Sequence, residues 1–242
     1  MTRVLPRIGL LLASLLLVAC DAFRYQPLAD FTQEGALFPP APLGVSEQAM
    51  IVRRVQALTG RATPVSVRAS ARGAFSAADA VESLHVVFQA DPKARHPQSP
   101  GRTFVLLQSE DGLKVFRPAL DGDFTGIANL VRMPDGKDRA VIYDAISGAG
   151  EVEVRAQLLG VASPEATELD VIKDFGVVYA GQWSPKDGDA GRGELRASKL
   201  FYRGRAPKWE FLREHFTKAC AQDAPWVRKG VGPQQDTLSA KP

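Results

Sequence analysis

Apolar and polar positions alternate in short runs over most of this chain, and this pattern predicts β-strands. From Pro64 onward the runs are rich in β-branched and aromatic residues, as in "LHVVFQA" and "TFVLLQ", and turn-forming residues separate them. The segment "TFVLLQSEDGLKVFRP" predicts a hairpin, because Asp111 and Gly112 lie between two apolar runs. Two more hairpins are predicted around "ISGAG" and around "SPKDGDAGRG".

Two segments have helical spacing instead. Residues 46–60, "SEQAMIVRRVQALTG", predict a helix with Ser46 as its N-cap and Gly60 as its stop. Residues 206–216, "APKWEFLREHF", predict a second helix with Pro207 in its first turn. Helices do not alternate with the predicted strands, so a parallel sheet is not expected. The predicted fold class is mainly β (α+β): an antiparallel sheet, a sandwich or a partial barrel, with a helix near each end.

Composition divides the chain into four parts. Residues 1–19 are predicted to be a signal peptide, 20–44 a lipidated Pro-rich tether, 45–230 a single β-rich domain, and 231–242 a disordered tail. The prolines of "FPPAP" favour extended chain in the tether. Some of its apolar residues are expected to pack against the domain instead; the candidates are Phe23, Phe31, Leu37 and Phe38.

The first residues are typical of an export signal. Arg3 and Arg7 precede an apolar run over residues 8–19, which is too short for a comfortable membrane-spanning helix. The run ends in "LVAC" at Cys20 and resembles the bacterial lipobox. This resemblance implies cleavage before Cys20, diacylglycerol on its sulfur, and attachment to a membrane of the bacterial cell envelope. Asp21 resembles an inner-membrane retention signal of enteric bacteria; the choice between inner and outer membrane stays open.

Charge and cysteine content narrow the possible partners. Removing Arg3 and Arg7 lowers the formal net charge from +3 to +1 (3 − 2), so nucleic acid is not an expected partner. Basic residues gather between 196 and 230, and such a face suits anionic lipid, an acidic polymer, or the acidic strands of the same domain. With Cys20 lipidated, Cys220 has no disulfide partner within the chain and is expected to be buried and inert.

One interior stretch predicts a ligand. In "LDGDFTGIANLV", the oxygen-bearing residues Asp121, Asp123, Thr125 and Asn129 resemble the calcium loop of FG-GAP and VCBS-type repeats. Only two of the four are carboxylates, so the resemblance implies weak calcium binding. The alternative is an ordinary Asp and Gly turn. An EF-hand is excluded, because Arg132 occupies the position where that loop has glutamate.

Catalytic motifs are lacking, and no catalytic residues are assigned. The three histidines, His85, His96 and His215, are scattered along the chain. We therefore expect a membrane-anchored binding or scaffolding module without catalysis, whose envelope protein or polymer partner stays open. The alternative is a lipid-anchored envelope hydrolase whose catalytic residues are dispersed in the sequence.

Overall fold

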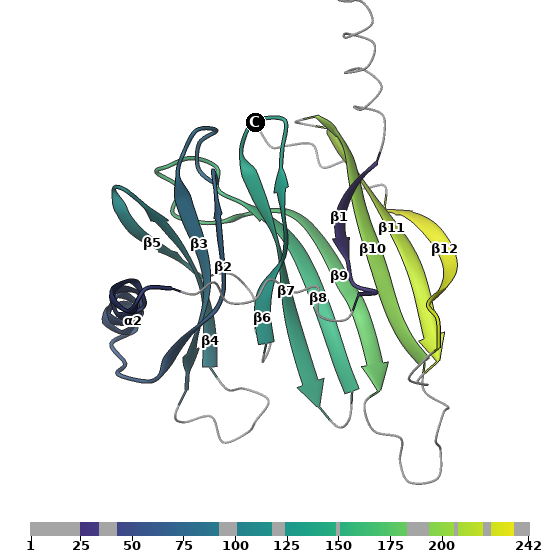
Figure 1. Ribbon diagram of the computed structural model, residues 1–242, viewed down its shortest axis with the longest axis horizontal. Helices are drawn as coiled ribbons and strands as arrows, with labels where there is room; N and C mark the ends of the chain where they lie inside the picture. The colour runs from purple at the N-terminus through teal and green to yellow at the C-terminus, as the bar shows by residue number, and fades with distance from the viewer. Residues whose placement is uncertain are drawn as a thin grey trace, which may run out of the picture.

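The computed structural model describes residues 25–33, 43–91, 101–117, 124–148, 151–182, 194–205, 208–219 and 224–234. Within these ranges the chain forms two antiparallel sheets and one helix, α2 (Val45–Thr59), and neither sheet closes into a barrel (Figure 1). The predicted class, mainly β and antiparallel, is therefore confirmed. No helix in the described part of the chain is long and apolar enough to cross a bilayer.

The smaller sheet has four strands in sequence order: β2 (Val65–Gly73), β3 (Glu82–Ala90), β4 (Gly101–Ser109) and β5 (Gly112–Phe116). Strands β4 and β5 form the hairpin predicted from the sequence, and its last pair joins Ser109 to Gly112. Gly112 has φ of +130°, which a residue with a side chain rarely adopts. The sequence signal for this hairpin was therefore local turn chemistry.

The larger sheet has eight strands. Seven follow sequence order: β6 (Phe124–Arg132), β7 (Asp138–Gly148), β8 (Glu151–Gly160), β9 (Asp170–Gln182), β10 (Glu194–Arg205), β11 (Lys208–Ala219) and β12 (Val227–Gln234). The eighth, β1 (Gln26–Asp30), pairs with β10. The predicted hairpins around "ISGAG" and "SPKDGDAGRG" are confirmed as the antiparallel pairs β7–β8 and β9–β10.

Strand β1 fills a split in the larger sheet. Strand β11 pairs with β10 along one whole edge. On the other edge, β9 pairs with β10 only at Arg196 and Ala197, and β1 takes over from Lys199 to Tyr202. Asn129 of β6 donates its Nδ2 hydrogen to the carbonyl of Leu28 at 2.7 Å. The sheet therefore curls until β1 lies between β10 and β6.

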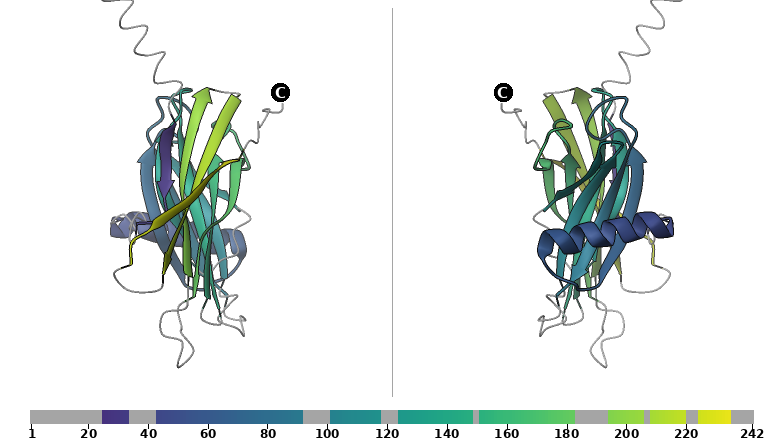
Figure 2. Two further views of the ribbon diagram at one scale, coloured as in Figure 1. Left: turned by 90° about the vertical axis from the view of Figure 1, so that its right-hand side faces the viewer. Right: turned by 90° about the vertical axis from the view of Figure 1, so that its left-hand side faces the viewer.

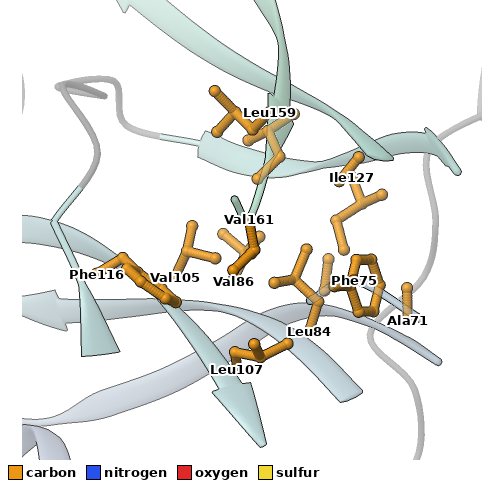
Figure 3. Packing of buried hydrophobic residues seen from close by; sticks show 13 residues of the cluster. Ala71, Phe75, Leu84, Val86, Val105, Leu107, Phe116, Ile127, Leu159 and Val161 are labelled. Carbon is orange, nitrogen blue, oxygen red and sulfur yellow. The ribbon is translucent and has the colours of Figure 1, made fainter. Parts of the chain in front are cut away.

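Three apolar clusters hold these layers together. Helix α2 crosses the outer face of the smaller sheet (Figure 2) and buries Ile51 and Val55 against it. A second cluster lies between the two sheets, where Phe75 and Leu84 meet Ile127 of β6 (Figure 3). Complete burial of one such side chain stabilises the fold by about 1.5–3 kcal/mol. The smaller sheet is thus covered by apolar contacts on both faces.

The third cluster fills the concave side of the curled sheet. It contains Leu28 of β1, Phe175 of β9, Leu200 of β10 and Phe211 of β11, all buried. The rings of Phe175 and Phe211 meet edge to face, with centroids 5.6 Å apart and an interplanar angle of 81°. Strand β1 thereby contributes to the core as well as to the backbone pairing.

The predicted second helix over 206–216 is wrong. Strand β11 occupies the described part of this segment from Lys208 onward and pairs with β10 without a break from the Arg205–Lys208 pair to the other end. Trp209 and Phe211, two positions apart, both pack on the concave cluster, which is the spacing of a strand. Helix propensity is a weak preference, and pairing with β10 overrides it here.

The folded part extends past both ends of the predicted domain 45–230. Strand β1 lies inside the predicted tether, with Leu28 fully buried and Phe31 packed on the concave cluster. Strand β12 continues to Gln234, inside the predicted disordered tail. These strands are stabilised by partners far away in the sequence, which local composition does not reveal. Other residues of the two segments, including Phe23, Leu37 and Phe38, lie outside the described residues.

Helix α2 confirms the prediction for residues 46–60 with one correction. Its N-cap is Gly44, which provides no side-chain hydrogen bond, so Ser46 does not cap the helix. The helix ends at Gly60 as predicted, because Gly60 adopts the left-handed conformation with φ of +65°.

Candidate functional site

The start of β1 lies beside the end of β10, which pairs with the start of β11 (Figure 1). Gln26 pairs with Tyr202, and the residue before it, Tyr25, has the guanidinium of Arg203 4.5 Å from its ring centroid. On the other face of the hairpin, the rings of Tyr202 and Trp209 have centroids 6.2 Å apart. All three aromatic residues are half-buried. We define the β1–β10–β11 corner as these four residues, which lie at the start of β1, the end of β10 and the start of β11: Tyr25, Tyr202, Arg203 and Trp209.

The sequence segment 203–210, which includes Arg203 and Trp209 of the corner, has more basic than acidic residues. Residues 203–210 contain three basic residues and one acid, Glu210, for a formal charge of +2 (3 − 1). Arg203 Nε donates a hydrogen bond to Glu210 Oε2 at 2.5 Å, and this hydrogen bond raises the pKa of Arg203. Burial raises the pKa of the Tyr202 hydroxyl. The corner thus combines half-buried aromatic rings with a sequence segment of net positive charge.

The predicted lipidation residue, Cys20, lies outside the described residues, five positions before Tyr25 (25 − 20). A fully extended chain of that length reaches ~18 Å. Any group attached to Cys20 is therefore confined to the neighbourhood of the β1–β10–β11 corner.

The structure describes two of the four predicted calcium ligands. Asp121 and Asp123 lie outside the described residues, whereas Thr125 and Asn129 lie in strand β6. The Thr125 hydroxyl is buried, 3.1 Å from the hydroxyl of Thr103 and 3.4 Å from Asp144 Oδ1. Asn129 binds the backbone through both amide atoms, donating to Leu28 O and accepting from Leu130 N at 2.9 Å.

The side chains of Thr125 and Asn129 therefore form hydrogen bonds with other protein groups, and they do not face a common site for an ion. Among the described residues, no three or more His, Cys, Asp or Glu side chains gather as metal ligands would. The calcium loop stays a prediction, and it depends on Asp121 and Asp123.

A buried serine–histidine pair lies beneath helix α2. Ser70 of β2 and His85 of β3 are direct cross-strand partners, and Ser70 Oγ lies 2.8 Å from His85 Nδ1. The other ring nitrogen, Nε2, lies 3.9 Å from Glu47 Oε1 of α2. Sequence analysis placed His85 on a strand and missed Ser70, because only the register of β2 and β3 brings them together. Ser, His and Glu are the residue types of a hydrolase triad.

The surroundings of this Ser70–His85 pair do not suit nucleophilic catalysis. His85 is 1% exposed and Ser70 7% exposed, so the hydroxyl that would attack a substrate is enclosed. Burial lowers the pKa of His85, while the charge of Glu47 opposes this effect. Within the described part of the chain, His85 Nε2 has no hydrogen-bond partner. The pair is therefore a polar contact inside the layer between α2 and the smaller sheet.

The basic residues of the last strands are largely paired within the same sheet. Lys199 Nζ lies 2.9 Å from Asp30 Oδ2, and Arg228 Nη2 lies 2.5 Å from Glu214 Oε1. The partners in these contacts lie on β1 and β11 rather than in the acidic strands within 110–194 that the sequence suggested. The end of β10 and the start of β11 add two further basic residues to this part of the sequence, Arg205 and Lys208.

Arg213 has a structural role. It lies on β11, and its side chain reaches across β10, where Nε donates to Ser198 Oγ at 2.8 Å. Its Nη1 donates to Phe175 O at 3.0 Å, and its Nη2 donates to Val177 O. Burial lowers the pKa of this guanidinium. Arg213 therefore joins β11 to β9 across the split that β1 fills.

The remaining residues considered in the sequence analysis, His215, His96 and Cys220, do not form a further candidate site among the described residues. His215, two positions after Arg213, has a pKa lowered by partial burial and by the charge of Arg213. His96 and Cys220 lie outside the described residues. Comparison with protein-family models, with curated proteins and with solved structures found no match for this chain.

Proposed function

We propose that this chain is a lipid-anchored protein of the bacterial cell envelope, whose β-rich domain binds or scaffolds at the membrane surface without catalysis. One observation carries the proposal: strand β1 begins at Gln26, almost directly after the lipobox cysteine Cys20. A folded domain with a fully buried Leu28 near its start would be held close to the membrane by lipid on Cys20. Two or more acyl chains hold a protein stably, whereas one chain binds only marginally.

The burial of the Ser70–His85 pair supports a non-catalytic role. A serine nucleophile needs access to the substrate and a base that takes its proton. The Ser70 hydroxyl is in contact with the His85 ring, but a substrate could not reach it, since both residues are buried beneath α2. The functional surface of the domain is therefore expected on its exposed faces.

The alternative is the lipid-anchored hydrolase, which the Ser70–His85–Glu47 arrangement favours. It requires α2 to move away from the smaller sheet, because α2 carries Glu47 and covers His85. A fluorophosphonate probe, which labels activated serines, distinguishes the two functions. We expect no labelling of the membrane-bound protein; labelling that Ser70→Ala removes would favour the hydrolase.

The anchor itself is tested by acylation. Cells fed an alkyne fatty acid should label the wild-type protein and place it in the membrane fraction. Cys20→Ala should leave an unlabelled protein, either uncleaved or soluble. Equal labelling of Cys20→Ala would contradict lipidation at this residue.

A further inference from the structure

We propose that the β1–β10–β11 corner lies against the anionic phospholipid headgroups of the membrane that holds Cys20. This inference rests on the proposed lipidation of Cys20 and adds an orientation for the whole domain. The curled sheet would stand with the end of β10 toward the bilayer and with the start of β6 away from it (Figure 1).

Chain length supplies the first argument. Five positions separate Cys20 from Tyr25 (25 − 20), so at most ~18 Å separates a lipidated cysteine from the first described residue. Strand β1 then fixes that point in the fold, because Gln26 pairs with Tyr202 and Leu28 is fully buried. The membrane therefore has this corner as its nearest part of the domain.

The chemistry of the corner supplies the second argument. Tyr and Trp are enriched at membrane interfaces, where an amphipathic ring meets both headgroups and acyl chains. Tyr25, Tyr202 and Trp209 are each half-buried and so present part of each side chain to the surroundings. Cations close to such a surface are attracted to anionic lipid. The net charge of +2 within residues 203–210 (3 − 1) is of the sign that this surface attracts.

The arrangement of the charges supplies the third argument. Glu210, the acid within residues 203–210, is paired with Arg203, whose guanidinium also covers the Tyr25 ring. Arg205 and Lys208 flank the turn and pair with each other in the register of β10 and β11. In the register of the two strands, two basic residues therefore stand opposite each other at this end of the hairpin.

Fluorescence of Trp209 tests the orientation. The chain has three tryptophans, so Trp183→Phe with Trp226→Phe leaves Trp209 as the reporter. The lipidated protein is reconstituted in vesicles of phosphatidylethanolamine and phosphatidylglycerol that contain lipids brominated near the headgroup end of the acyl chains. We expect these lipids to quench Trp209, compared with vesicles that lack bromine.

A single tryptophan at the end of the sheet away from the corner serves as the control for the quenching of Trp209. Phe124, 55% exposed at the start of β6, is replaced by tryptophan in a chain whose own three tryptophans are phenylalanine. The Phe124→Trp reporter should keep its fluorescence in brominated vesicles. Equal quenching of both reporters, or no quenching of Trp209 in acylated and membrane-bound protein, would overturn the orientation while leaving the anchor intact.

Two further variants separate orientation from simple tethering. A flexible Gly-Ser insertion between Ala22 and Phe23 should reduce the quenching of Trp209 without changing acylation. Arg205→Glu with Lys208→Glu should reduce the quenching of Trp209 in vesicles with phosphatidylglycerol. The same double variant should leave the quenching unchanged in vesicles without anionic lipid. Loss of acylation and of membrane binding in the parent protein would instead contradict the proposed function.

An acidic polymer is the competing occupant of the corner. If Trp209 is not quenched by brominated lipid but its emission shifts when a soluble polyanion is added, the corner binds polymer and the membrane orientation is wrong. If the shift needs anionic vesicles and the polyanion has no effect, the orientation is supported.

Discussion

Ser70 Oγ lies 2.8 Å from His85 Nδ1, although the two residues are 15 positions apart in the sequence. A bulge between Val67 and Ala69 sets this contact, because it shifts the register of β2 against β3 by one residue. Without that shift, Ser70 would point to the opposite face of the sheet, into the apolar layer between the two sheets. A backbone irregularity therefore decides which face receives a polar side chain.

Removing one member of this buried pair should destabilise the fold. Ser70→Ala leaves Nδ1 of His85 without its partner, at an expected cost of about 1–3 kcal/mol in the free energy of unfolding. Ser70→Ala with His85→Leu should cost less than the sum of the two single changes, because the two residues are in contact. Urea denaturation of the four proteins measures this coupling; strict additivity would contradict the contact.

Stability should depend on pH through His85. Burial lowers its pKa below the ordinary value of 6.5 in the folded state. The unfolded chain then binds the proton more readily, so the contribution of His85 is full above pH 6.5 and is lost as the pH falls below that value.

Chemical denaturation at several pH values checks the sign of this effect. The free energy of unfolding should fall with decreasing pH in the wild type and fall less steeply in His85→Leu. His215→Gln is the control for the second histidine whose pKa is lowered. An unchanged slope in His85→Leu would assign the pH dependence to other groups.

Arg213 should contribute more to stability than an exposed arginine of the same strands. Arg213→Met leaves the carbonyls of Phe175 and Val177 without their donor, at an expected cost of about 1–3 kcal/mol. Arg228→Met breaks an exposed ion pair with Glu214, which is worth about 0–1 kcal/mol. Thermal denaturation compares the two variants, and equal losses would contradict the bridging role of Arg213.

The hairpins were predictable from the sequence because their signals are local. Asp111 and Gly112 between apolar runs were enough for β4–β5, and Gly60 was enough for the end of α2. The strands that were missed depend on distant partners: β1 and β12 lie in proline- and glycine-containing segments, and pairing with β10 or β11 stabilises each. Strand β11 was assigned as a helix because its local pattern suits both periods, and the partner strand decided between them.

Candidate sites were harder to predict for the same reason. The Ser70–His85 contact requires a bulge, and the β1–β10–β11 corner requires a strand from the start of the chain to meet a hairpin near its end. His85 was found as a residue of a strand, but no spacing in the sequence points to Ser70. No short sequence motif predicts either the Ser70–His85 contact or the β1–β10–β11 corner.

Strand β1 should be necessary for stability. Leu28→Ala should cost about 2–5 kcal/mol, because it opens a cavity in the concave cluster. A chain that begins at Ala41 lacks β1 altogether and should unfold at lower urea concentration than one that begins at Phe23. If the two chains are equally stable, β1 contributes no net stability and the tether prediction for this segment was right.

Calcium provides the test of the loop at 121–129. If Asp121 and Asp123 bind the ion in the folded state only, calcium at ten times Kd should add about 1.4 kcal/mol of stability. This corresponds to a rise of about 2–4 °C in Tm. Melting with calcium, with magnesium and with chelator should show the rise in wild type and not in Asp121→Ala with Asp123→Ala; no rise in the wild type would leave an ordinary turn.

The position of β1 in the split between β9 and β10 has a consequence for the order of folding. Ala29 pairs with Leu200, so 171 positions (200 − 29) separate the two partners. During synthesis from the N-terminus, β1 emerges before the other described strands and can pair with β10 only after most of the chain has been made. Contacts between such distant residues form slowly. Pulse-labelling hydrogen exchange during refolding should therefore find the amides of β7 and β8 protected before those of β1.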